Sequence, residues 1–216
     1  MTNNYETLPN GYKMRQGKDY HFTSDSVLLA NFFRFKRRDR AVELCAGSGI
    51  IGIYAYSQHP CEHIDFVEIN PDDCKVIADN IALNNLPASV MNVDAKTLTT
   101  TSFARPVDVV ICNPPYEKVT NLASENKNIA RATHEIDINF DDIVSVSARI
   151  LKSGGHLYIE HKAERVAEII VTLKKYRFAT KRMCFVYAKN KPAYLVLIDA
   201  VLDGHDNVQV SFKENI

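Results

Sequence analysis

Short apolar runs typical of buried strands alternate along the chain with longer segments of helical periodicity. The strand-like runs cover residues 41–45, 63–69, 88–93, 107–112, 156–161, 182–188 and 194–202. The helical segments cover residues 22–35, 50–57, 70–84, 137–152 and 163–176. Strands that alternate with helices predict a doubly wound, mostly parallel α/β sheet with helices on both faces. The last two runs have no helix between them, so we expect a seven-stranded sheet with one antiparallel strand.

Two helix boundaries carry clear local signals. Asn70 is a favourable N-cap, Pro71 suits the first helical position, and acidic residues follow in the first turn. Later in the chain, the pair Gly154-Gly155 predicts the end of the helix over 137–152, before a strand that starts at His156.

The chain is predicted to form one sizeable domain with a full core, because it has 216 residues and no internal repeat or break in composition. We expect an N-terminal extension over 1–40, made of a polar arm and a helix. The α/β domain itself covers 41–202, and a C-terminal tail covers 203–216.

From the composition we expect a cytoplasmic protein. A hydrophobic content of 46% excludes a disordered chain, and no apolar segment reaches the length of a membrane span. Because residues 1–17 are polar and lack an apolar run, we expect no secretion signal there. The five scattered cysteines form no CxxC pair, which favours buried reduced thiols and predicts no metal site.

Charge is unevenly distributed although the net charge is zero. Basic residues gather over 13–40 and again over 162–191, where Lys174 and Lys181 are our candidates for contacts with substrate phosphates. Such asymmetry produces a basic face on a protein that is neutral overall. The alternative is that these residues are solvated helix faces with no ligand.

The segment from Ile111 to Tyr116 combines an amide, two prolines and an aromatic ring directly after an apolar strand. The side-chain oxygen of Asn113 can accept a hydrogen bond from an exocyclic amino group. The prolines stiffen the turn, so that the Pro114 carbonyl becomes a second acceptor at a set distance. Tyr116 offers a flat face to a planar group such as adenine. The alternative is an ordinary loop leaving a strand, which Asn-Pro often marks.

A glycine-rich loop follows the first strand, and residues 47–52 match the pattern GxGxxG. A dinucleotide would meet the carboxylate of Glu43 just before the loop, and the chain has no room for the catalytic domain that a dehydrogenase adds. A cationic ligand fits better. S-adenosylmethionine carries a sulfonium and an ammonium but no phosphate. Glu43 can favour the ammonium directly or through water, while Gly47 and Gly49 make room for the methionine and ribose.

Two further acids stand at strand ends. Glu68 ends the second strand, where a carboxylate can accept both hydroxyls of a ribose, and Asp94 follows the third strand, where it can accept the adenine amino group. Each acid alone is more often a helix cap or a surface group. Acids at three successive strand ends favour a shared ligand.

These motifs resemble those of class I S-adenosylmethionine methyltransferases, which have a Rossmann-like fold. Residues 43–49 are similar to the first motif, residues 67–70 to the second, and residues 113–116 to the amino-methylating motif. Across most of the chain, including residues 22–30 and 130–131 and the strand after Gly154-Gly155, the sequence resembles the bacterial tRNA1(Val) adenine-37 N6-methyltransferase family.

The resemblance implies methyl transfer from S-adenosylmethionine to the N6 of an adenine in tRNA. Asn113, Pro114 and Tyr116 would be catalytic, with Asn113 also against the cofactor, and Pro115 and Arg131 would contact the substrate. Residues 130–135 depart from the pattern of many relatives, because two residues separate Arg131 from the expected His-Glu pair.

Three other functions stay open. A glutamine methyltransferase acting on translation release factors uses the same clamp, but it normally carries an added N-terminal helical domain, and about forty residues precede the first strand here. A DNA adenine methyltransferase would need a target-recognition region that we do not find. A non-catalytic RNA-binding module is the remaining alternative. The oligomeric state is left open, with a monomer favoured.

Overall fold

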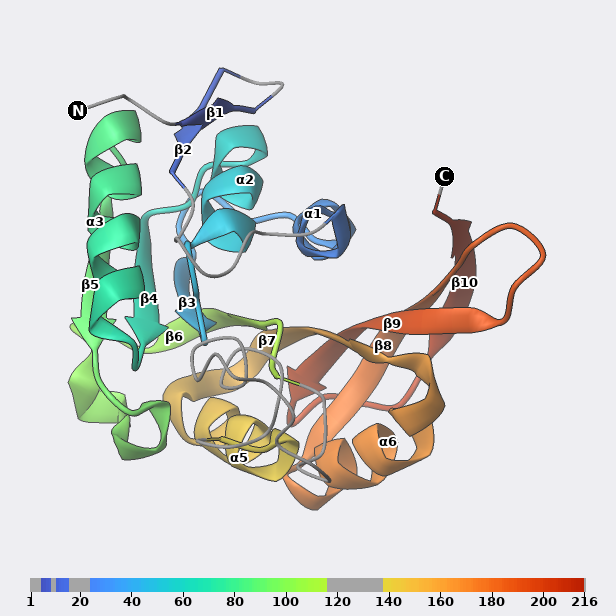
Figure 1. Cartoon of the computed structure of the whole chain (residues 1–216). Coiled ribbons are helices and arrows are strands. Elements are labelled where there is room, and N and C mark those ends of the chain that lie inside the picture. The colour runs from blue at the N-terminus through green and yellow to red at the C-terminus, as the bar shows by residue number, and fades with distance from the viewer. Residues whose placement is uncertain (1–4, 9–10, 16–23, 116–137, 216) are drawn as a thin grey trace, which may run out of the picture.

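The computed structural model describes residues 5–8, 11–15, 24–115 and 138–215. Its centre is an eight-stranded sheet in the order β10-β8-β9-β7-β6-β3-β4-β5 (Figure 1). The strands are β3 (Arg40–Leu44), β4 (His63–Glu68), β5 (Ala88–Asn92), β6 (Val107–Cys112), β7 (Leu151–Lys162), β8 (Phe178–Tyr187), β9 (Ala193–Leu202) and β10 (Gln209–Glu214). Only β9 runs antiparallel to its neighbours in this sheet, which confirms the mostly parallel α/β class.

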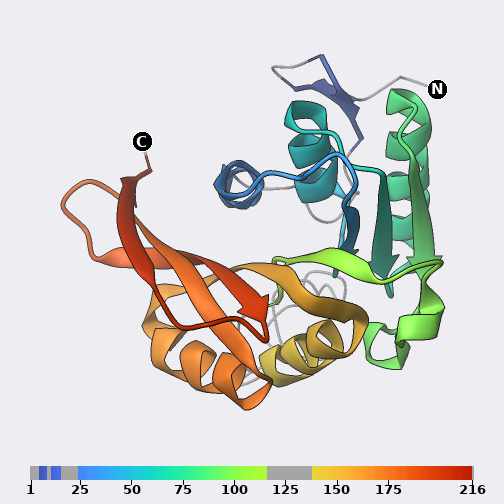
Figure 2. The ribbon, with the colours of Figure 1, turned by 180° about the vertical axis from the view of Figure 1, so that it is seen from behind.

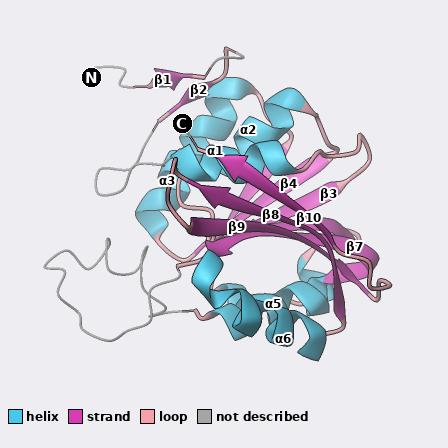
Figure 3. Ribbon diagram, turned by 90° about the vertical axis from the view of Figure 1, so that its right-hand side faces the viewer, coloured by secondary structure: helices cyan, strands magenta, loops and turns pink. Residues whose placement is uncertain are grey.

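Helices cover both faces of the sheet (Figure 3). One face carries α1 (Ser24–Phe32), α2 (Ile50–Gln58) and α3 (Pro71–Asn84), and the other carries α5 (Phe140–Ile150) and α6 (Val166–Lys175). Three short 3-10 helices, η1 (Ala95–Thr97), η2 (Thr100–Ser102) and η3 (Ala163–Arg165), join these elements. The view from behind shows the same two layers of helices with the sheet between them (Figure 2).

The core consists of two apolar clusters, one on each face of the sheet. Leu29, Ile53 and Phe66 are fully buried in the cluster beneath α1 and α2. Ile143 and Leu173 are fully buried in the cluster beneath α5 and α6. Because successive strand residues point to opposite faces, each central strand contributes side chains to both clusters.

The predicted start of α3 is confirmed. The Asn70 side chain accepts a hydrogen bond from the Asp72 N–H (3.0 Å), and Pro71 occupies the first helical position. The cap satisfies one of the backbone donors that every helix start leaves unpaired. A local sequence signal therefore fixes the direction in which the chain leaves β4.

The prediction that Gly154-Gly155 ends a helix is wrong. The helix ends at Ile150, β7 begins at once, and both glycines lie within that strand. The register between β6 and β7 shifts here, since Val107 pairs with Leu151 but Val109 pairs with His156. The extra residues form a bulge, and Gly154 adopts a left-handed φ of 77°, which favours glycine.

The sheet has one strand more than predicted, because β10 forms within the stretch expected to be a tail. It pairs with β8 in parallel, and all its residues are exposed. A second, two-stranded sheet joins β1 (Glu6–Thr7) to β2 (Lys13–Met14) in the predicted N-terminal arm.

Amide side chains of α3 hold the arm in place. Asn84 accepts a hydrogen bond from the Lys13 N–H (2.9 Å) and donates one to the Lys13 carbonyl (2.7 Å). Asn80 does the same with the backbone of Arg15, at 2.7 and 3.0 Å. The two amide side chains therefore bond the backbone N–H and C=O groups of the arm, as a neighbouring strand would. No helix among the described residues is long and apolar enough to cross a membrane.

Candidate active site

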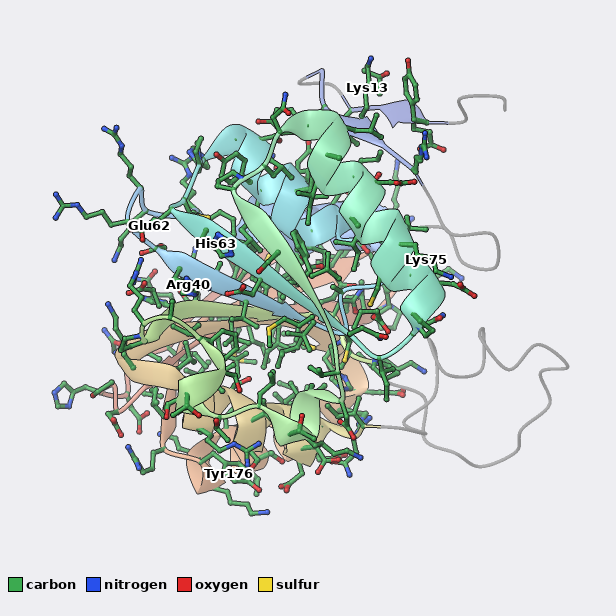
Figure 4. The ribbon with its side chains drawn as sticks, turned by 90° about the vertical axis from the view of Figure 1, so that its left-hand side faces the viewer. Lys13, Arg40, Glu62, His63, Lys75 and Tyr176 are labelled. Atoms are coloured by element: carbon green, nitrogen blue, oxygen red, sulfur yellow. The ribbon has the colours of Figure 1, made fainter. Side chains whose placement is uncertain are left out.

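The sheet changes direction of winding between β3 and β6. From β3 the chain passes outward through β4 and β5, then returns to β6 on the other side of β3. Such a switch point opens a crevice at the carboxyl ends of the strands. Leu44 pairs with both Val67 and Cys112, so the segments that follow β3, β4 and β6 lie together at this edge. Figure 4 shows the opposite edge, where Arg40 and His63 stand at the amino ends of β3 and β4.

The glycine loop after β3 is a tight left-handed turn. Gly47 and Gly49 have φ values of 55° and 75°, and the Gly49 N–H donates to the Ala46 carbonyl (2.7 Å). A Cβ on Gly49 would lie 3.2 Å from the Phe66 ring, whereas a Cβ on Gly47 would meet no atom of the described residues within 4 Å. Gly49 thus lies against the core, and Gly47 faces open space where a ligand can approach the backbone.

Glu43 lies beneath this loop and is only 1% exposed. The Gly52 N–H, in the first turn of α2, donates to its Oε2 (2.7 Å). A Cβ on Gly52 would lie 2.6 Å from that oxygen, so the last glycine of the motif makes room for Glu43. Burial raises the pKa of Glu43 to about 8. Glu43 therefore joins β3 to α2, and its contact with a ligand ammonium stays a prediction.

Glu68 fastens the glycine loop to the end of β4. Its two oxygens accept hydrogen bonds from the N–H groups of Gly47 and Asn70, each at 2.9 Å. Each carboxylate oxygen has a further lone pair, so the group can also accept the hydroxyls of a ribose. Asp94 accepts from the Lys96 N–H (2.9 Å) and caps η1, with 36% of its side chain exposed at the same edge.

The segment after β6 presents a buried acceptor. The Oδ1 atom of Asn113 is buried and has no hydrogen-bond partner among the described residues. Pro114 and Pro115 beside it are buried as well. A buried acceptor left unpaired costs about 1–3 kcal/mol, which a bound amine would recover. Tyr116 and Arg131, both predicted to contact the substrate, lie outside the described residues.

The two candidate lysines lie elsewhere in the fold. Lys174 forms an ion pair with Asp206, and Lys181 donates to the His205 carbonyl and to the Asn207 side chain. These partners follow the end of β9. Since β9 is antiparallel, its carboxyl end lies at the edge where the parallel strands begin. The structure therefore does not bring Lys174 and Lys181 to Asn113, and their contact with substrate phosphates remains a prediction.

Two residues near the carboxyl ends of the parallel strands, where the candidate site lies, were not predicted from the sequence. Asn80 is fully buried, and besides the arm its Nδ2 donates to the Ser48 carbonyl (3.0 Å) in the glycine loop. Glu160 is fully buried near the end of β7. A signal existed for both: Asn80 is a polar residue on the buried face of a helix, and Glu160 is a carboxyl near a strand end, like Glu68.

These residues can hold a ligand that offers hydroxyls, an amine and a positive charge. Glu68 and Asp94 supply acceptors on one side of the glycine loop, Asn113 supplies a buried acceptor on the other, and Gly47 leaves space between them. Among the described parts of the chain, no three His, Cys, Asp or Glu side chains gather as a metal site.

Comparison with known proteins assigns the chain to a family. A family model described as Methyltransferase small domain matches residues 21–186. The chain is 28% identical over 154 residues to a release factor glutamine methyltransferase of Bifidobacterium longum, covering 64% of this chain and 52% of that protein. It is 26% identical over 152 residues to a tRNA1(Val) (adenine(37)-N6)-methyltransferase of Pseudoalteromonas translucida, covering 67% and 63%. The chain thus spans less than two thirds of the length of these relatives.

Solved structures show the same fold. A predicted O-methyltransferase of Agrobacterium tumefaciens superimposes with a TM-score of 0.67 at 21% identity, over 88% of this chain and 86% of that one. The TYW2 protein of M. jannaschii in complex with AdoMet superimposes with a TM-score of 0.63 at 14% identity, over 91% and 84%. At these identities the likeness confirms the Rossmann-like fold and leaves the reaction to be argued from the site.

Proposed function

Because the chain belongs to the methyltransferase small domain family and is a class I S-adenosylmethionine-dependent methyltransferase, we propose that it methylates the N6 of an adenine in tRNA. The target nucleotide that we propose is position 37 of tRNA1(Val). One observation carries the proposal: Asn113 holds a buried acceptor, with no donor among the described residues, beside the open glycine loop. S-adenosylmethionine, when bound, supplies a methyl group on a positively charged sulfur.

The residues of this chain would position the amine. An adenine N6 is a poor nucleophile because its lone pair is delocalised into the ring. Its two N–H groups can donate to Asn113 Oδ1 and to the Pro114 carbonyl, which turns the lone pair toward the cofactor side of the site. Alignment of this kind contributes up to about 7–11 kcal/mol, so no strong base is needed. The released proton passes to water, and stacking on Tyr116 would add roughly 1–3 kcal/mol.

The cofactor side uses the acids at the strand ends. Glu68 would accept the ribose hydroxyls, Asp94 the adenine amino group of the cofactor, and Gly47 and Gly49 would admit the chain of the methionine. Glu43 would favour the ammonium directly or through water, for which its carboxyl must be ionised.

The choice of a tRNA adenine rests on the sequence resemblance and on the tRNA1(Val) (adenine(37)-N6)-methyltransferases among the relatives. The second candidate is a glutamine methyltransferase, which the relative from Bifidobacterium longum supports. Adenine and the glutamine side chain both carry an NH2 group beside an atom that accepts hydrogen bonds. Asn113 and Pro114 can therefore bind the NH2 group of either substrate.

Incubation with labelled methyl donor and total tRNA, release factor or duplex DNA separates these functions. We expect label in tRNA, and nucleoside mass spectrometry should identify N6-methyladenosine. Label in release factor alone would establish the second candidate. A protein that binds tRNA and transfers no label to any substrate would be a binding module.

Asn113→Ala tests the acceptor. We expect turnover to fall by about 10²–10³, the usual effect of losing one group that bonds the transition state, with little change in cofactor affinity. Turnover is measured at saturating substrate concentration. Cofactor affinity is measured separately by calorimetry. Asn31→Ala is a matched control, because Asn31 is an exposed residue of α1 that donates within its own helix. Near wild-type turnover of Asn113→Ala would exclude the proposed role.

A further inference from the structure

Glu160 is a buried carboxyl that contrasts with the other buried acids of the fold. Its side chain is fully buried in β7, and neither of its oxygens has a hydrogen-bond partner among the described residues. Burying a polar group is costly unless a hydrogen-bond partner is supplied. The buried carboxyls that serve the fold, Glu43 and Asp199, each accept hydrogen bonds from the protein. Glu160 therefore resembles a group whose partner is a ligand.

The strand register places Glu160 beside Asn113. Cys112, the last residue of β6, pairs with Ile159 of β7, and the next residues along the two parallel strands are Asn113 and Glu160. Cys112 and Ile159 both contribute to the cluster beneath α5 and α6. Because strand side chains alternate between faces, Glu160 points to the other face, the side of α1. Two buried polar groups that find no partner among the described residues thus lie next to each other at the edge that carries the site.

The surroundings of Glu160 favour its protonated form. Asp25 acts on it from α1, and Tyr194 approaches from β9, where its hydroxyl donates to Asp25 (3.2 Å). On its own strand, Tyr158 and Lys162 stand two residues before and after it. Burial, together with the negative charge of Asp25, raises the pKa of Glu160 to about 8. At neutral pH the carboxyl mostly keeps its proton and can donate a hydrogen bond.

We infer that Glu160 contacts the methyl acceptor, with its carboxyl O–H donating to the ring nitrogen beside the amine that Asn113 and Pro114 hold. The inference rests on the proposed function, in which the acceptor is adenine. Adenine carries an unprotonated ring nitrogen on each side of its N6 amine, N1 on one side and N7 on the other. The Asn113 oxygen accepts from the amine, and the Glu160 O–H donates to the ring nitrogen beside it. Together they select a base with an amine next to an unprotonated ring nitrogen, and they reject a base whose neighbouring ring nitrogen carries a proton.

Two substitutions at Glu160 separate this role from a structural one. Glu160→Gln keeps a donor, so its turnover on tRNA should stay within about threefold of wild type. Glu160→Leu keeps the volume but not the donor, and should lose about 10–100-fold, the usual cost of one unpaired hydrogen bond. Turnover of the wild type should fall above about pH 8, whereas the profile of Glu160→Gln should stay flat there. Glu62→Gln is the control, because Glu62 is exposed and pairs with Arg105 (3.2 Å).

A substrate analogue tests the contact without any change in the protein. A stem-loop RNA is prepared with 1-deazaadenine or 7-deazaadenine at the target, each of which replaces one ring nitrogen by CH. One of the two should lower wild-type turnover about 10–100-fold, and the same analogue should cause no further loss in Glu160→Leu. Unchanged wild-type turnover with both analogues, or Glu160→Leu as active as wild type, overturns the role of Glu160. A wild-type protein that methylates no adenine overturns the proposed function instead.

Discussion

Gly52→Ala should destabilise the protein, although the same change in most helices is favourable. An added methyl would lie 2.6 Å from Glu43 Oε2 and 2.9 Å from the Phe66 ring, and real Cβ atoms do not approach so closely. Overpacking costs about 1–3 kcal/mol. Displacing the Glu43 carboxyl from the Gly52 N–H, now 2.7 Å away, costs about 1–3 kcal/mol more. Alanine returns about 1 kcal/mol of helix propensity. The free energy of unfolding should therefore drop by about 1–5 kcal/mol.

Urea unfolding followed by circular dichroism measures this change. Gly47→Ala is the matched control, because a methyl there meets no atom in the described part of the chain and its cost is that of the left-handed φ, about 1–2 kcal/mol. In a Glu43→Ala background the new methyl loses its nearest contact, the Glu43 Oε2 atom, so Gly52→Ala should cost less there than in the wild type. A Gly52→Ala protein as stable as wild type would refute the close packing of Glu43 against α2.

Two further predictions concern charge. Burial raises the pKa of Glu43 to about 8, so the folded protein keeps a proton that the unfolded chain releases near 4.5, and stability should fall as pH rises between these values. Glu43 should contribute about 1.4 kcal/mol per pH unit to the slope, and Glu160, whose pKa is raised as far, should contribute as much again. Glu43→Gln should remove its own share, and an unchanged slope in urea titrations would contradict this. If Lys174 and Lys181 contact phosphate, tRNA affinity should fall steeply with salt, and Lys174→Glu with Lys181→Glu should weaken it, unlike Lys75→Glu on α3. Filter binding at several salt concentrations measures both, and a flat response would point to a protein substrate.

Local signals predict the parts of the fold that depend on neighbouring residues. Asn70 and Pro71 fix the start of α3 through contacts within one turn, so the sequence predicts that boundary well. The bulge at Gly154 depends on how β7 pairs with β6, a strand more than forty residues away, and no local pattern encodes that register. The alternation of Val208, Val210 and Phe212 could have predicted β10, but its parallel pairing with β8 is likewise a long-range contact.

The site divides in the same way. The order of strands and acids along the chain is enough to predict that Glu43, Glu68 and Asp94 share one edge of the sheet. The sequence does not predict the structural hydrogen bonds that these acids accept. Glu43 bonds the Gly52 N–H and Glu68 bonds the Gly47 N–H, and each bond joins separate elements of the fold. The place of Glu160 beside Asn113 was not predictable for a related reason, since it follows from the register of two strands.

Asn80 on α3 links the N-terminal arm to the glycine loop after β3. The Asn80 Nδ2 donates to both the Arg15 carbonyl and the Ser48 carbonyl. A single side chain therefore couples the position of the arm to the shape of the glycine loop. Undocking the arm would leave a buried amide half satisfied and would relax the turn that it braces. If the glycine loop binds the methyl donor as proposed, a substrate or partner that displaces the backbone of Arg15 from α3 would thereby weaken that binding.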